Sequence, residues 1–104
     1  MSHDLLVETA LKRQEAFKNL PKYLKAIKNK VSELDPKAEV YLFGSVAEGK
    51  HNYSSDIDIL IITTLYPANV MAELWKAGIK DPFEIHVYPR EKAGFFKKAK
   101  LIKL

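Results

Sequence analysis

Two aspartates separated by one residue, Asp56 and Asp58, stand at the start of an isoleucine-rich run. In a β-strand, residues two positions apart project from the same face, so the two carboxylates would lie side by side. Like charges at that distance repel each other, and burying either one without a partner is costly. A divalent cation relieves both problems, and Mg²⁺ takes oxygen ligands, usually together with substrate phosphates. The pair therefore indicates a metal site, with a solvent-facing pair at a strand start as the alternative.

Gly44 and Ser45 follow a short apolar run, and ten residues separate them from the aspartate pair. Glycine lets the backbone approach a ligand closely and adopt unusual dihedral angles. The Ser45 hydroxyl and the backbone N–H groups of a short helical turn over 46–48 would suit the β- and γ-phosphates of a nucleotide. A Gly-Ser dipeptide alone is common in turns, but its place between two expected strands makes Gly44 and Ser45 the predicted nucleotide-binding residues.

Two helices are expected ahead of these residues, and both are expected to contribute to the core. The first runs from Leu5 toward residue 20, where Pro21 either kinks it or occupies an early position of a second helix. The second helix ends at the turn signal Asp35-Pro36. Its apolar residues recur at spacings of four and three, which predicts a stripe packed into the core: Leu20, Leu24, Ile27, Val31 and Leu34.

Three strands are expected over 40–43, 57–63 and 83–88, and a helix over 68–77 lies between the last two, with Val70, Leu74 and Trp75 available for packing. The order of two helices, two strands, a helix, a strand and a tail predicts an α/β (α+β) sandwich. Its small mixed β-sheet would have three or more strands with helices mainly on one face. We expect one domain over residues 1–104, with its core at 40–88 and a basic tail at 90–104.

The Gly44-Ser45 dipeptide, the ten-residue spacer and Asp56-x-Asp58 resemble the signature of the DNA polymerase beta-like nucleotidyltransferase superfamily. Over residues 40–88 the chain resembles the small, stand-alone minimal nucleotidyltransferases of prokaryotes. Many of those act as the antitoxin of a two-gene pair whose other member is an all-helical HEPN protein. The resemblance implies a nucleotidyltransferase-like fold and two Mg²⁺ ions, with Mn²⁺ as the alternative, bound by Asp56, Asp58 and a third carboxylate on a later strand.

Glu84 is the position that matches this third carboxylate, because it alternates with the apolar residues of its strand. Asp81 is the competitor, but it precedes a proline and is more typical of a turn. The resemblance then implies catalytic roles for Asp56, Asp58 and Glu84 in transferring a nucleoside monophosphate, AMP from ATP, to a hydroxyl of a protein or nucleic-acid acceptor. The nucleoside triphosphate would be the substrate.

The loop after Gly44 departs from that family, since Val46 and Glu48 stand where arginines often meet the triphosphate. Lys50 and His51 are the alternative source of positive charge there, or an exposed polar loop. His86 shares the strand face of Glu84 and would orient it, act as a base, contact a phosphate, or be structural. The remaining candidates for nucleotide contact, explained equally well by loop composition, are Tyr53, Ser54 and Ser55.

The chain has 104 residues, no cysteine, and no apolar run of the roughly 20 residues that a membrane-spanning helix needs. Disulfides and thiolate metal sites are thereby excluded, and a cytoplasmic protein that does not bind membranes is expected. Residues 90–104 carry six basic residues and one acidic residue, a local charge of +5 against a total of +4. Such a tail binds nucleic acid or forms a solvated surface.

Three functions therefore remain open: an enzyme, a binding module that neutralises a protein partner by occlusion, and a nucleic-acid-binding protein that uses the tail. Open edges of a small sheet and spare apolar residues in the tail predict a homo-oligomer or a protein complex.

Overall fold

A four-stranded mixed sheet forms the centre of the computed structural model, which describes residues 2–52 and 54–104. The strands lie in the order β3-β2-β1-β4. β1 runs antiparallel to β2 and β4, whereas β2 and β3 are parallel. The elements follow one another as α1 (Ser2–Lys18), α2 (Leu20–Leu34), β1 (Glu39–Phe43), α3 (Gly44–Ala47), β2 (Ile57–Ile62), α4 (Pro67–Lys76), β3 (Phe83–Tyr88), the 3₁₀-helix η1 (Arg90–Phe96) and β4 (Ile102–Lys103).

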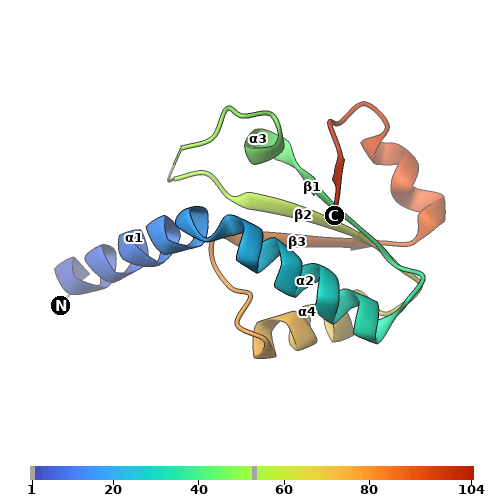
Figure 1. Ribbon diagram of the computed structural model, residues 1–104, viewed down its shortest axis with the longest axis horizontal. Helices are drawn as coiled ribbons and strands as arrows, with labels where there is room; N and C mark the ends of the chain where they lie inside the picture. The colour runs from blue at the N-terminus through green and yellow to red at the C-terminus, as the bar shows by residue number, and fades with distance from the viewer. Residues whose placement is uncertain (1, 53) are drawn as a thin grey trace.

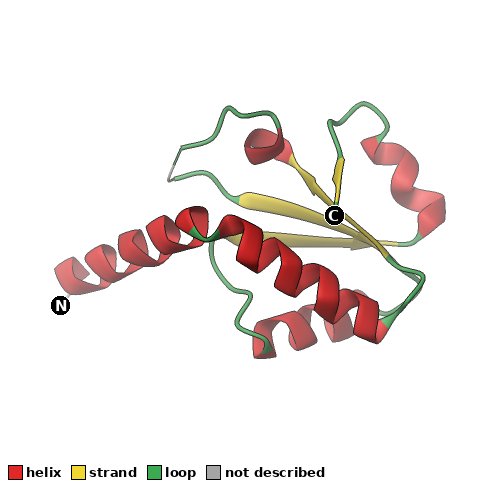
Figure 2. Cartoon of the chain, viewed as in Figure 1, coloured by secondary structure: helices red, strands yellow, loops and turns green. Residues whose placement is uncertain are grey.

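The α+β architecture predicted from the element order is confirmed, with α2 and α4 together on one face of the sheet (Figure 2). Pro21 occupies an early position of α2, which is one of the two alternatives expected from the sequence; the other was a kink in the first helix. The register aligns Phe43 with Asp58 across β1 and β2, and Asp58 with Glu84 across β2 and β3. The end of β1 and the beginnings of β2 and β3 therefore meet at one end of the sheet.

The core lies between the sheet and these two helices. Ile57, Ile59 and Ile61 of β2 are fully buried, as the alternation of the strand predicts. The stripe on α2 is confirmed for Ile27 and Val31, which are buried, and for Leu20 and Leu24, which pack against the core, whereas Leu34 is half-buried and lies outside this cluster. From α4, Val70 and Leu74 complete the core.

The expected packing of Trp75 is wrong, because its side chain is 60% exposed. Val70 and Leu74 are four residues apart and share one helix face, whereas Trp75 follows Leu74 by one residue and is turned about 100° away from it. The ammonium group of Lys80 lies 4.6 Å from the centre of the Trp75 ring instead.

Helix α1 extends away from the sheet, so the N-terminus lies far from the other elements (Figure 1). Among the side chains of this helix that the structure describes, the expected contribution to the core comes from its last part, where Ala16 is 3% exposed and Phe17 packs against the core. Val7 and Leu11 are 47% and 59% exposed, in keeping with the projection of the first part of α1 beyond the sheet (Figure 1). Among the described residues, no helix has the length and apolar character required to cross a bilayer.

The tail returns to the sheet, which the sequence pattern did not predict. After η1, strand β4 pairs with β1, and the Leu104 backbone N–H donates to the Val40 carbonyl at 2.9 Å. The Phe96 ring lies 5.3 Å from the ring of Phe43, between centroids. The edge of β1 that a three-stranded sheet would leave open is thus covered by the chain's own tail, while Phe95 stays 85% exposed.

Candidate active site

The junction of β1 and α3 brings the backbone of Gly44 against the carboxylate of Asp58. A Cβ atom added at Gly44 would lie 2.2 Å from Asp58 Oδ2. The φ angle of Gly44 is +77°, a left-handed conformation that side chains disfavour. Glycine is therefore required here both by the backbone conformation and by the closeness of the Asp58 carboxylate.

Ser45 is the second residue of the short helix α3, so a helical turn is present but begins at Gly44, two residues before the predicted 46–48. The Ser45 carbonyl accepts a hydrogen bond from the Lys50 backbone N–H at 2.9 Å, and the Gly44 carbonyl accepts one from Glu48 at 3.1 Å. These bonds hold Ser45 at the end of β1, next to the glycine that contacts Asp58.

Asp58 of β2 lies close to Glu84 and His86 of β3, as the strand register and the alternation of side chains require. His86 Nε2 is 3.4 Å from Asp58 Oδ1 and 3.7 Å from Glu84 Oε1. One potential ligand atom from each residue lies within 4.8 Å of the others. The exposed fractions of the three side chains are 22%, 53% and 26%, so the group is accessible from solvent.

Asp56 lies at the border of this group, one residue before β2 begins, and its side chain is 49% exposed. Its carboxylate nevertheless reaches Glu84. A hydrogen bond with Asp56 is the largest cause that raises the pKa of Glu84 above its ordinary value, and burial is the second. The charge of His86 opposes this shift, and the charges of Asp58 and Asp56 add to it. Asp56 thus lies near Glu84, whereas the ligand atoms that lie within 4.8 Å of one another belong to Asp58, Glu84 and His86.

The ring of His86 packs edge-on against the ring of Phe43, with 5.1 Å between centroids and an interplanar angle of 67°. Phe43 is the last residue of β1 and directly precedes Gly44. This contact directs the His86 imidazole toward the carboxylates. His86 therefore lies among the potential metal ligands, a role that was not one of the alternatives considered for it from the sequence.

Arg13 of α1 is the site residue that sequence reasoning missed. Its Nη2 lies 3.6 Å from Asp56 Oδ1 and 2.9 Å from Asp81 Oδ1, and its Nη1 donates to the Ser55 carbonyl at 3.2 Å. Nothing in the local motif points to a residue so far ahead in the chain. One available signal was composition: the chain has fifteen lysines and two arginines, and a guanidinium suits multiple contacts with oxygen atoms.

The serines before Asp56, which were candidates for nucleotide contact, form hydrogen bonds within their own loop. The Ser54 backbone N–H donates to Asn52 Oδ1 at 2.8 Å, and Ser55 Oγ accepts from the Asn52 backbone N–H at 3.1 Å. Tyr53 lies outside the described residues. These bonds favour the explanation by loop composition for the two serines.

Lys50 and His51 are exposed in the same loop. The His51 ring stacks on Phe17 of α1, with 5.1 Å between centroids and 3° between planes. His51 therefore links the loop to α1. Asp81 lies in the turn before β3, ahead of a cis Asp81-Pro82 peptide bond, which agrees with its prediction as a turn residue.

The donor set fits a divalent cation. Carboxylate oxygens, here those of Asp58 and Glu84, are the ligands that Mg²⁺ and Mn²⁺ prefer, whereas an imidazole nitrogen is more typical of zinc, copper, iron or nickel. The pKa of Glu84 is raised first by its hydrogen bond with Asp56 and then by burial, with smaller contributions from the charges of Asp58 and Asp56. A bound cation would favour the ionised carboxylate that these effects oppose.

One family of known proteins matches the chain: the nucleotidyltransferase domain, over residues 24–103. No curated protein and no solved structure matches it. The matched span begins inside α2, ends with β4, and contains Gly44, Asp58 and Glu84, whereas α1 lies outside it. Because the match extends over well more than half of the sequence, the chain belongs to the nucleotidyltransferase domain family.

Proposed function

We propose that this protein is a metal-dependent nucleotidyltransferase that transfers AMP from ATP to a hydroxyl group of a separate protein or nucleic acid. Family membership supplies nucleotidyl transfer as the general function and a nucleoside triphosphate as the substrate. The observation that carries the proposal is the group formed by Asp58, Glu84 and His86, whose ligand atoms lie within 4.8 Å of one another beside Gly44.

In this proposal Asp56, Asp58 and Glu84 hold two Mg²⁺ ions, with Mn²⁺ as the alternative, and Gly44 and Ser45 bind the phosphates. Bound metal supplies positive charge for the triphosphate and lowers the pKa of an acceptor hydroxyl. His86, whose Nε2 lies 3.4 Å from Asp58 Oδ1, keeps that carboxylate oriented.

The proposed reaction proceeds in line at the α-phosphorus. The acceptor hydroxyl would lose its proton to water, because the cation that Glu84 helps to hold would lower the pKa of that hydroxyl. The hydroxyl oxygen forms a bond with the α-phosphorus as the bond to the β-phosphate oxygen breaks, and pyrophosphate leaves. Positioning and charge neutralisation supply most of the rate enhancement.

A separate macromolecule is the proposed acceptor, and exposed apolar side chains outside the site are candidates for its contact. Leu11 of α1 and Phe95 of η1 are 59% and 85% exposed. Apolar surface of this kind marks protein interfaces when it is contiguous. The resemblance to minimal nucleotidyltransferases suggests a HEPN-like protein as this partner, with the chain as its antitoxin, and a second copy of the chain is the other candidate.

A second candidate function is a non-catalytic binding module that inhibits a partner by occlusion. Val46 and Glu48 favour it, because neither can offer positive charge to a triphosphate immediately after the Gly-Ser dipeptide. Under this function the partner would bind without being modified.

The two functions are separated by incubating the protein with Mg²⁺, ATP and the protein encoded beside its gene, followed by mass spectrometry of that protein. Transfer predicts a mass increase of one AMP, which is lost with chelator or in Asp58→Asn. ATP labelled on the α-phosphate should label the partner, whereas ATP labelled on the γ-phosphate should not. Complex formation with no change in mass would favour occlusion and would contradict the enzymatic proposal for this acceptor.

A further inference from the structure

Arg13 connects helix α1 to two turns that are far apart in sequence. Its guanidinium donates to the carbonyl of Ser55, directly before Asp56, and to Asp81, three residues before Glu84. β2 and β3 are parallel, and each begins at one of these turns. One side chain therefore ties together the two points from which the carboxylate-bearing strands start.

Asp56 needs such an anchor more than the other carboxylates do. Asp58 and Glu84 face each other in the ladder between β2 and β3, so backbone pairing fixes their separation. That ladder begins with Ile57, and Asp56 lies outside it. The Asp56 side chain is 49% exposed, compared with 22% for Asp58.

We propose that Arg13 is a positioning residue for the metal site: it holds the turn before β2 against the turn before β3 and thereby sets Asp56 relative to Glu84. This inference rests on the proposed function, since it assigns a role toward the metal that these carboxylates would bind. A planar guanidinium suits the role, because its donors are fixed in one plane and contact several oxygens at once. The side chain is only 21% exposed, which restricts its movement.

The role lies outside the matched part of the family, which begins at residue 24. The first part of helix α1 projects away from the sheet (Figure 1), while Ala16 and Phe17 near its end pack into the core. Arg13 therefore makes α1 part of the site, although α1 contributes little to the core.

A charge effect and a positioning effect of Arg13 predict opposite changes in metal affinity. The guanidinium lies 3.6 Å from Asp56 Oδ1, so its positive charge by itself opposes cation binding. Removing that charge would strengthen metal binding if charge were its main contribution. Losing the three-point contact would weaken metal binding, because metal sites tolerate little displacement of their ligands.

The test measures binding of Mn²⁺ and Mg²⁺ to the full chain by calorimetry, without nucleotide, for the wild type, Arg13→Lys and Arg13→Met. Arg13→Lys keeps the positive charge but loses the planar guanidinium with its several donors, so we expect the metal affinity of this variant to fall about tenfold. The metal affinity of Arg13→Met should fall by less, because removing the positive charge of the guanidinium partly offsets the lost positioning. Lys12→Met is the matched control: Lys12 is the neighbouring residue on α1, is 70% exposed and pairs with Glu8 at 3.6 Å, so its affinity should stay within about twofold of wild type.

Asp81→Asn provides an independent variant that leaves α1 intact and weakens the 2.9 Å contact with Arg13. We expect a smaller loss of metal affinity than in Arg13→Lys, and no further loss when the two changes are combined, since both break the same link. Melting temperatures measured without metal show whether each variant is folded.

Unchanged affinity in a folded Arg13→Lys variant, or tighter binding in Arg13→Met than in the wild type, would overturn the positioning role. Additive losses in the double variant would overturn the link through Asp81. A wild-type protein that binds neither cation would instead overturn the proposed metal-dependent function itself.

Discussion

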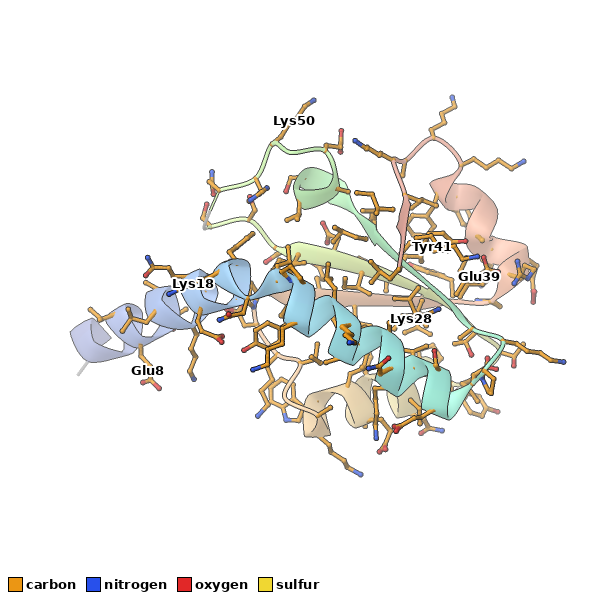
Figure 3. The ribbon with its side chains drawn as sticks, in the orientation of Figure 1. Glu8, Lys18, Lys28, Glu39, Tyr41 and Lys50 are labelled. Carbon is orange, nitrogen blue, oxygen red and sulfur yellow. The ribbon has the colours of Figure 1, made fainter. Side chains whose placement is uncertain are left out.

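Glu39 of β1 and Glu84 of β3 lie in the same sheet, and their pKa values shift in opposite directions. The pKa of Glu39 is lowered, first by a hydrogen bond from the Tyr41 hydroxyl and then by one from Arg90. Glu39 and Tyr41 lie next to each other on β1, close to the tail (Figure 3). The pKa of Glu84 is raised, with a hydrogen bond to Asp56 as its largest cause and burial as its second.

The opposite directions of these pKa shifts distinguish Glu39, a structural carboxylate, from Glu84, a carboxylate suited to binding a ligand. The ionised form of Glu39 has its partners within the chain, and its contact with Arg90 attaches η1 to β1. The ionised form of Glu84 is disfavoured by acidic neighbours, so its compensation must come from a proton or from an added cation. A shift in pKa alone identifies neither role; the sign and the cause together do.

The largest expected effect is the loss of transfer in the double variant Asp56→Asn/Asp58→Asn. Without the two carboxylates the metal site loses most of its negative charge, and activity should fall about a thousandfold or more. Removing like charges relieves repulsion, so the melting temperature of the metal-free protein should hold or rise. Activity is measured by labelling with ATP, and stability by thermal unfolding in chelator.

Asp35→Asn is the control for this variant. Asp35 accepts a hydrogen bond from the Thr63 hydroxyl at 2.7 Å, and this bond is the largest cause that lowers its pKa. Its replacement should lower the melting temperature and leave transfer intact. A large fall in melting temperature for the Asp56/Asp58 variant would instead show that those carboxylates, like Asp35, have a structural role.

A second, smaller effect is expected from Gly44→Ala, compared with Gly49→Ala. Both glycines have positive φ angles, +77° and +71°, so each alanine costs about 1–2 kcal/mol of backbone strain. At Gly44 the new Cβ also meets Asp58 Oδ2, whereas at Gly49 it meets no atom within 4 Å. Displacing Asp58 should weaken Mn²⁺ binding by about tenfold to a hundredfold in the first variant alone. Equal losses in both variants would show that Gly44 matters for its φ angle and not for its closeness to Asp58.

Metal affinity should depend on pH through Glu84. A protonated carboxyl does not bind the cation, so affinity falls as the pH is lowered. Because the pKa of Glu84 is raised, this loss should begin at a higher pH than it would for an unperturbed glutamate, and should amount to severalfold over the first unit of pH. Calorimetric titrations with Mg²⁺ across pH 5 to 8 provide the measurement, and Glu84→Gln should bind weakly with a flatter dependence. A wild-type profile without this dependence would contradict the assignment of Glu84 as a ligand.

Much of the site could be predicted because its spacing is local. Asp56 and Asp58 are two residues apart, and alternation along a strand is enough to assign Glu84 and His86 to one face. That Glu84 would join the aspartates was implied by the family resemblance, and the parallel pairing of β2 with β3 aligns it with Asp58. Gly44 was assigned as a nucleotide-binding residue; its contact with Asp58 depends on pairing between β1 and β2, which the sequence pattern leaves undefined.

The contacts of Arg13 could not be predicted, because they join residues 42 and 68 positions apart and no periodicity encodes them. Strand β4 spans two residues, which is too few for an alternating pattern to indicate a strand. The projection of α1 was missed for a related reason: apolar residues on one helix face predict burial, but whether a sheet lies beneath them depends on tertiary structure.

The smallest effect is a difference in stability between Glu39→Gln and Glu84→Gln in the metal-free protein. A lowered pKa in the folded state means that Glu39 stabilises the fold at neutral pH and loses this contribution as the pH falls through its folded pKa. A raised pKa means that protonated Glu84 is the favoured form, so its contribution is present at low pH and is lost as the pH rises through its folded pKa.

At pH 7, therefore, Glu39→Gln should lower stability by about 1 kcal/mol, a modest value because its partner Arg90 is 69% exposed. Glu84→Gln should raise the melting temperature slightly, because an amide carries no charge to repel Asp56 and Asp58. Thermal unfolding in chelator between pH 4 and pH 7 should show the two variants on opposite sides of the wild type at neutral pH and converging on it in acid. Addition of Mg²⁺ should then reverse the order of wild type and Glu84→Gln, since only the wild type keeps the complete set of carboxylates. If both variants were destabilised at pH 7 without metal, Glu84 would be held by the fold in the same way as Glu39, and the contrast between the two regions would not reflect a ligand site.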